Sequence, residues 1–192
     1  MTALTKVQAL TAAEVCRLYE LDPEAGALLD ETSTPASFIE RLMGEQRFAD
    51  AARFLAYALP KREAVWWACL CARAVTNGET SSDNLAALDA AEAWVYKPID
   101  ENRRKAMEFA EKTKMDTSAS WAAVAAFWSA GSMAPADAPV VPPGEELTGA
   151  AVSGAVILAA VQKEPEKAPE KYARFLTQGL EVARGGSGRD AL

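Results

Sequence analysis

Two cysteines and two tryptophans lie close together in the stretch "REAVWWACLCAR", residues 62–73, and could belong to a metal site or to a core. A structural zinc site needs four nitrogen or sulfur ligands, but the chain has no histidine and only three cysteines, Cys16, Cys69 and Cys71. On a helix, Cys69 and Cys71 point about 200° apart, so they can neither chelate one ion together nor form an unstrained disulfide. We therefore expect no metal, three reduced cysteines, and small-hydrophobe behaviour for this pair.

The absence of histidine also removes most side-chain catalytic systems. It excludes Ser-His-Asp and Cys-His nucleophiles, H-E-x-x-H metalloproteases and Glu-x-x-His di-iron bundles. The chain also contains no S-x-x-K, G-x-x-x-x-G-K-[ST] or G-x-G-x-x-G motif. The sequence therefore predicts no catalytic residue, no cofactor and a protein that is not an enzyme.

Glu63 is the one carboxylate whose setting, beside Trp66 and Trp67, suggests acid–base chemistry. The favoured interpretation is structural. A carboxylate in the first turn of a helix is stabilised by the helix dipole, and Glu63 could pair with an arginine. An enzyme using carboxylate chemistry is thus the third functional hypothesis.

Composition favours a soluble, all-α protein. Alanine, the strongest helix former, dominates the sequence, and half of the residues are hydrophobic. A net charge of −7 argues against binding to a nucleic-acid backbone but suits a basic protein partner. The N-terminus lacks the layout of a secretory signal, and residues 148–161 are too few to span a bilayer. We expect a cytoplasmic protein with no membrane contact.

Apolar spacing and Pro, Gly, Asn and Ser breaks predict about nine helices, at residues 11–20, 35–44, 46–58, 61–76, 83–96, 100–113, 117–130, 147–162 and 168–184. Thr34, Asp83, Asp100 and Thr117 are the expected helix caps. The result is one helical domain over residues 1–184, an irregular multi-helix bundle or short helical-hairpin array. Residues 185–192 should form a flexible, frayed tail.

The helix at 61–76 is apolar nearly all round, so it should be buried on several sides. Trp66 and Trp67 point about 100° apart and must contact different neighbours. We expect both to maintain the core, with a partner for each indole N–H.

The Pro-rich connection 132–146 must cross the surface in an extended form, because its prolines break any helix. The favoured interpretation is a structural strap pinned to the body by Val140 and Val141. The alternative is a binding loop, in which Met133, Val140 and Val141 offer apolar anchors to a partner.

Charged residues dominate 100–114, where most charges match at i, i+4, as in Glu101 with Lys105 and Arg104 with Glu108. This stretch should be a solvated face. Arg103 and Arg104 could instead contact an acidic partner.

The chain resembles a family of small uncharacterised helical proteobacterial proteins. The resemblance lies in the segments "LPKREAVWWACLCARA", "AAEAWVYKPIDENRRKAMEFA" and "SWAAVAAFWSAGSMAP", with "VVPP" following. The resemblance covers residues 59–184, and the family is connected with type VI secretion gene clusters. It carries no catalytic motif. It implies a cytoplasmic accessory role, such as an adaptor or chaperone for a secreted cargo. An immunity protein that neutralises a toxin is the alternative, and the oligomeric state stays open.

Overall fold

The computed structural model describes residues 3–135 and 137–189. Within these residues the chain forms ten α-helices, one 3₁₀ turn and no strand. The elements are α1 (Ala12–Cys16), α2 (Pro23–Gly26), α3 (Pro35–Gly44), α4 (Phe48–Ala58), α5 (Lys61–Val75), α6 (Ser82–Tyr96), α7 (Asp100–Glu111), α8 (Ser118–Phe127), α9 (Leu147–Val161), η1 (Pro165–Lys167) and α10 (Ala168–Ala183). The all-α, multi-helix prediction is confirmed.

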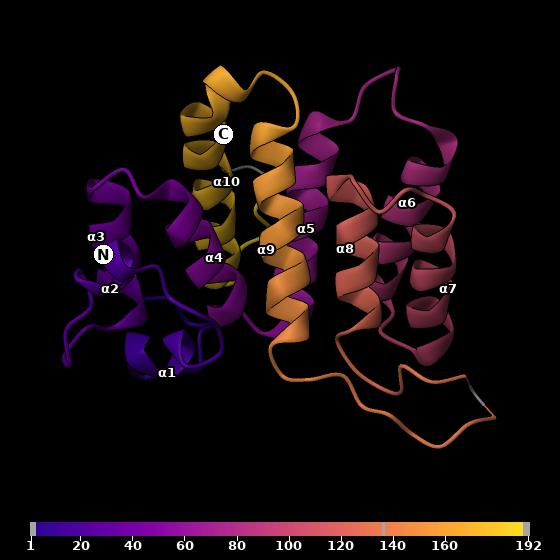
Figure 1. Cartoon of the computed structure of the whole chain (residues 1–192), viewed down its shortest axis with the longest axis horizontal. Helices are drawn as coiled ribbons and strands as arrows, with labels where there is room; N and C mark the ends of the chain where they lie inside the picture. Colours follow the sequence, from indigo (N-terminus) through magenta and orange to yellow (C-terminus); the bar gives the residue numbers. More distant parts are fainter. Residues whose placement is uncertain (1–2, 136, 190–192) are drawn as a thin grey trace.

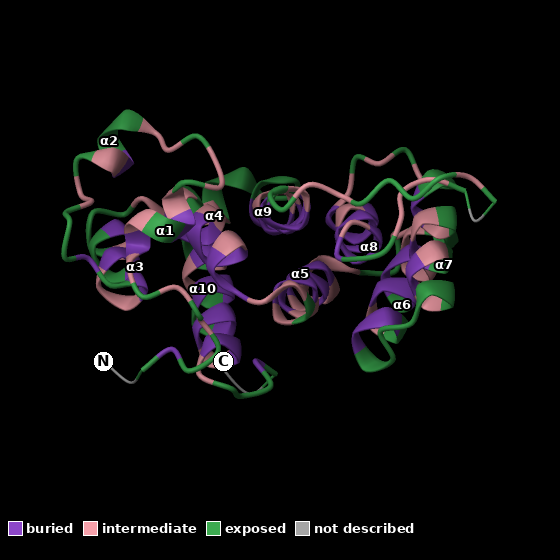
Figure 2. Cartoon of the chain, turned by 90° about the horizontal axis from the view of Figure 1, so that it is seen from below, coloured by how far each residue is buried: buried purple, intermediate pink, exposed green. Residues whose placement is uncertain are grey.

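The bundle is an elongated row of helices with α5 and α9 near its middle (Figure 1). α5 packs against α4, α6, α8, α9 and α10, and α9 packs against α4, α5, α8 and α10. α1 to α3 lie at one end of the row, and α6 and α7 lie at the other (Figure 2). The two central helices therefore connect both ends.

Small residues allow this close packing. All residues of α8 except Trp121 are buried, and five of these nine are alanine. Gly179 of α10 is required by the same closeness, because a Cβ there would lie 2.7 Å from Leu55 and from Trp67. Small residues thus let neighbouring helices approach each other closely around large buried side chains such as Trp67.

Trp67 meets the expectation of a core residue, since it is fully buried and donates its indole N–H to the Phe175 carbonyl at 2.7 Å. Trp66 is only half-buried and faces a different neighbour, donating to the Ser187 carbonyl at 2.7 Å. The partner comes from the segment after α10.

The expectation of a frayed tail is wrong for residues 185–189. Gly188 is buried, and the Arg189 guanidinium lies 4.9 Å from the centre of the Trp66 ring. Arg189 also donates to the Tyr96 hydroxyl at 2.5 Å. Glycine makes the segment flexible in isolation, but here it lets the chain turn back and cover Trp66. Residues 190–192 lie outside the described part of the chain.

The N-terminal prediction of one helix at 11–20 is also wrong. α1 ends at Cys16, and the chain turns before Asp22 caps α2 by accepting from the backbone N–H of Glu24 and Ala25. Because proline disfavours a helical residue before it, Pro23 starts a new helix and cannot extend the old one.

Two of the four expected caps are corrected. Thr34 and Thr117 cap α3 and α8 as expected. However, Ser81 caps α6, with Asp83 in its first turn, and α7 begins after Ile99 with no side-chain cap. Asp100 does not cap its helix, because both of its oxygens accept from arginines.

No helix in the described part of the chain is long and apolar enough to cross a membrane.

Candidate functional site

The loop that joins α8 to α9, residues 132–146, projects from one end of the bundle (Figure 1). Hydrogen bonds within the loop close its base. Met133 donates its backbone N–H to the Val141 carbonyl at 2.8 Å. The N–H groups of Ala134 and Val141 donate to the Ser132 hydroxyl at 3.1 and 3.0 Å. The two sides of the loop are therefore held together beside Ser132.

Arg103 of α7 anchors this base to the bundle. Its side chain is buried and donates to the carbonyls of Phe127 and Ser132, at 2.8 Å each. Its guanidinium also lies 4.6 Å from the centre of the Phe127 ring and forms an ion pair with Asp100. The end of α8 and the start of the loop are thereby fixed to α7.

Gly131 makes room for that guanidinium. Its φ of 68° lies in the left-handed region, and a Cβ there would come within 2.9 Å of the Arg103 Nε. Glycine thus satisfies both the turn after α8 and the position of the arginine.

Arg104 forms a second attachment, donating to Asp100 Oδ2 at 2.7 Å and to the Ala134 carbonyl at 3.1 Å. The expected Arg104–Glu108 pair is therefore replaced by Arg104–Asp100, whereas Glu101 does pair with Lys105. The hydrogen bonds from Arg104 and Arg103 hold the pKa of Asp100 below its usual range.

These contacts change the interpretation of the two arginines. Arg103 is only 2% exposed, so the expectation that it contacts an acidic partner is wrong. Arg104 is partly exposed but is also bonded to the loop. Sequence reasoning missed this role because the acceptors are backbone carbonyls, which no residue type marks.

The two valines of the loop face outward. Val140 is 77% exposed and Val141 is 47% exposed, while Met133 is half-buried near the base. The expectation of a strap pinned by Val140 and Val141 is therefore wrong: arginines hold the loop, and the valines are left at the surface. Asp137, Glu145 and Glu146 are also exposed.

The other residues considered for chemistry have structural surroundings. Glu63 pairs with Lys6 at 3.4 Å rather than with an arginine, and its side chain is 26% exposed. Cys69 and Cys71 are fully buried, and burial raises the pKa of both thiols. No group of His, Cys, Asp or Glu side chains that could hold a metal occurs among residues 3–135 and 137–189.

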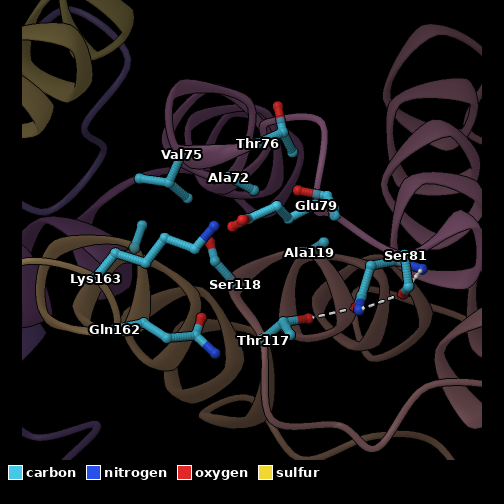
Figure 3. A pocket seen from close by; sticks show the side chains of 13 residues that line it. Ala72, Val75, Thr76, Glu79, Ser81, Thr117, Ser118, Ala119, Gln162 and Lys163 are labelled. Carbon is cyan, nitrogen blue, oxygen red and sulfur yellow. Dashed lines mark hydrogen bonds between the residues drawn. The ribbon is translucent and has the colours of Figure 1, made fainter.

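A separate pocket of about 240 Å³ lies where α5 and α9 end and α6 and α8 begin (Figure 3). Glu79, Ser118 and Lys163 point into it, and Ala72, Val75, Ala119 and Ala159 form apolar parts of its wall. This pocket could not be predicted from the sequence, because its wall combines three stretches, 72–84, 117–119 and 159–163, that are distant along the chain.

The all-helical fold and the projecting loop define a class of small helical protein. Residues 38–183 match the model of a family of unknown function, DUF6931, and the chain belongs to that family. No curated protein and no solved structure shows significant similarity to the chain.

Proposed function

We propose that this chain is a non-enzymatic, cytoplasmic protein-interaction protein that docks its partner on the loop 132–146. One observation carries the proposal: Arg103 fixes the base of the loop, while Val140 and Val141 are exposed. Apolar side chains on a loop that is already held in place can be buried by a partner at a low cost in conformational entropy. The prolines restrict the loop further.

The charges beside the valines indicate the kind of partner. Residues 132–146 contain Asp137, Glu145 and Glu146 but no lysine or arginine. The complementary surface is an apolar groove with a basic rim. Such complementarity raises the association rate and selects against acidic partners.

For the biological role, we propose an adaptor, chaperone or accessory factor of a bacterial secretion system of type VI. The support is the sequence resemblance described above, together with the interaction loop. The net charge of −7 supports a second candidate, an immunity protein that covers the basic active site of a toxin. Loss of an adaptor abolishes export of one cargo, whereas loss of an immunity protein makes its toxin lethal to the producing cell.

The test replaces Val140 and Val141 together by serine. A partner is first captured with the tagged protein, identified and purified, and its affinity for the parent and the variant is then measured by titration. We expect an unchanged melting temperature and an affinity at least about tenfold to a hundredfold lower, since fully burying even one of the two valines contributes roughly 1.5–3 kcal/mol. Leu10→Ser is the matched control, because Leu10 is 80% exposed and lies outside the loop.

Two outcomes contradict the proposal. Unchanged affinity would show that the partner docks elsewhere. A lower melting temperature, with binding lost only as the variant unfolds, would show that the valines stabilise the fold.

A further inference from the structure

We propose that the pocket between the ends of α5, α6, α8 and α9 binds a free α-amino acid with a short aliphatic side chain. The pocket lies away from the loop 132–146, so this inference is independent of the proposed function. Its volume, about 240 Å³, is below the roughly 300–1,000 Å³ typical of sites for drug-sized ligands and suits a small metabolite.

A buried hydroxyl without a partner points to a ligand. Ser118 is 2% exposed, lines the pocket, and its Oγ has no hydrogen-bond partner among the described residues. Buried polar atoms are almost always hydrogen-bonded, so such an atom needs an explanation. Figure 3 shows Ser118 in the pocket near Lys163 and Glu79.

The neighbouring polar residues show that Ser118 is an exception. Thr117 donates to Asn84 Oδ1 at 2.5 Å, and Asn84 donates to the Ser81 hydroxyl at 2.9 Å. Gln162 donates to the Asp116 carbonyl at 3.1 Å. These groups are engaged in holding the wall together, which leaves Ser118 available.

The start of α8 adds donors for a carboxylate. Thr117 accepts from the N–H of Ser120 through its side chain and from the N–H of Trp121 through its carbonyl. The N–H groups of Ser118 and Ala119 have no such partner within the described residues. At a helix N-terminus, free N–H groups and the helix dipole favour an anion. With the Ser118 hydroxyl and the Lys163 amine, they form a site for a carboxylate.

Glu79 supplies the opposite charge. Its carboxylate and the Lys163 amine both point into the pocket, and within the described part of the chain neither forms an ion pair. α5 ends at this pocket, and helix C-termini favour cations. A simple anion would be repelled by the Glu79 carboxylate, and a simple cation would be repelled by the Lys163 amine. A zwitterion satisfies both groups.

The apolar wall limits the rest of the ligand. Ala72, Val75, Ala119 and Ala159 surround the space between the charged groups. An aliphatic side chain can be buried there without leaving polar atoms unsatisfied. The ligand class is therefore an α-amino acid of the size of alanine, valine or leucine.

The test titrates the full-length, ¹⁵N-labelled protein with L-alanine, L-valine and L-leucine in turn and follows the amide resonances of Ser118 and Ala119 by NMR. We expect saturable shifts with at least one of them. For the tightest of the three, the matching carboxylic acid without its amine and the amine without its carboxylate should each bind at least about tenfold more weakly, because a charge-assisted hydrogen bond contributes about 1.5–3 kcal/mol.

Glu79→Gln, Lys163→Gln and Ser118→Ala should each weaken binding. The first two alter exposed residues and the third removes a hydroxyl that has no partner, so all three should fold. Glu45→Gln and Lys97→Gln are the matched controls, exposed and outside the pocket, and should bind like the parent. The proposal is overturned if none of the three amino acids shifts these resonances, or if the deaminated acid binds as tightly as the amino acid.

Discussion

Arg103 is a charged residue used in the interior to position a loop. A buried guanidinium is costly to desolvate unless it is paired with an opposite charge and hydrogen-bonded. Here Asp100 and the carbonyls of Phe127 and Ser132 accept from it, and the Phe127 ring lies over its face. The planar fork of arginine matches this arrangement, which the single ammonium of lysine cannot reproduce.

Arg103→Met should therefore destabilise the protein while leaving the helical content intact. Each of the two carbonyls that lose their donor should cost about 1–3 kcal/mol, and amide exchange at Val141 should accelerate as the loop loosens. Urea denaturation and hydrogen exchange provide the measurements. Arg17→Met is the control, because Arg17 is exposed. An Arg103→Met variant as stable as the parent, with unchanged exchange, would disprove the anchoring role.

The roles of some single residues could be predicted from the sequence, and those of others could not. The sequence predicts that Cys69 and Cys71 behave as small hydrophobes, and both side chains are buried. The roles of Arg103 and Ser118 could not be predicted. Arg103 depends on backbone carbonyls, which are the same in every residue type, and Ser118 depends on which side chains distant segments place around the pocket.

At the scale of elements, the segment after α10 acts as a cover for Trp66. Gly188 has a φ of 71°, and a Cβ there would lie within 2.8 Å of Leu70 and Val182. Ser187 and Arg189 on either side contact the Trp66 indole. The segment is therefore held by shape at one glycine and by polar contacts at its neighbours.

Gly188→Ala should release this segment without unfolding the bundle. The side chain would be strained by both the positive φ and the contacts with α5 and α10. We expect red-shifted tryptophan fluorescence as Trp66 gains water, and a lower melting temperature. Gly78→Ala is the matched control, since a Cβ there meets nothing within 4 Å. Emission and melting temperature equal to the parent would show that the cover is not needed.

The sequence predicted elements well where proline, glycine and capping residues mark their ends. α3, for example, begins at Pro35 after the Thr34 cap, as expected. The prediction failed for residues 11–20, where a helical apolar pattern continues past Cys16 but tertiary packing favours a turn. It also failed for residues 185–189. Their glycines indicate a segment that is flexible in isolation, but they do not show that Trp66 of α5 offers a surface on which the segment packs.

On the scale of the whole molecule, α5 and α9 determine whether the row of helices behaves as one unit. α9 contacts α4 and α10 on one side and α8 on the other, and α5 bridges the same groups. The N-terminal segment is attached to the bundle as well. The backbone N–H of Lys6 donates to the Ala183 carbonyl at 2.9 Å, and the Lys6 side chain pairs with Glu63. Losing α4 and α10 on one side, or α8 on the other, would expose apolar surface of both central helices.

We therefore predict a single cooperative unfolding transition for residues 1–184. All five tryptophans lie in α5, α6 and the region of α8, whereas α1 to α4 and α10 contain none. Tryptophan fluorescence thus follows one end and the middle of the row, and far-UV circular dichroism follows every helix. The two signals should coincide on heating or in urea, with equal calorimetric and van't Hoff enthalpies, if the chain is one domain. A loss of helical signal before any change in fluorescence would show that α1 to α4 unfold separately, and α9 would then be a boundary between two units.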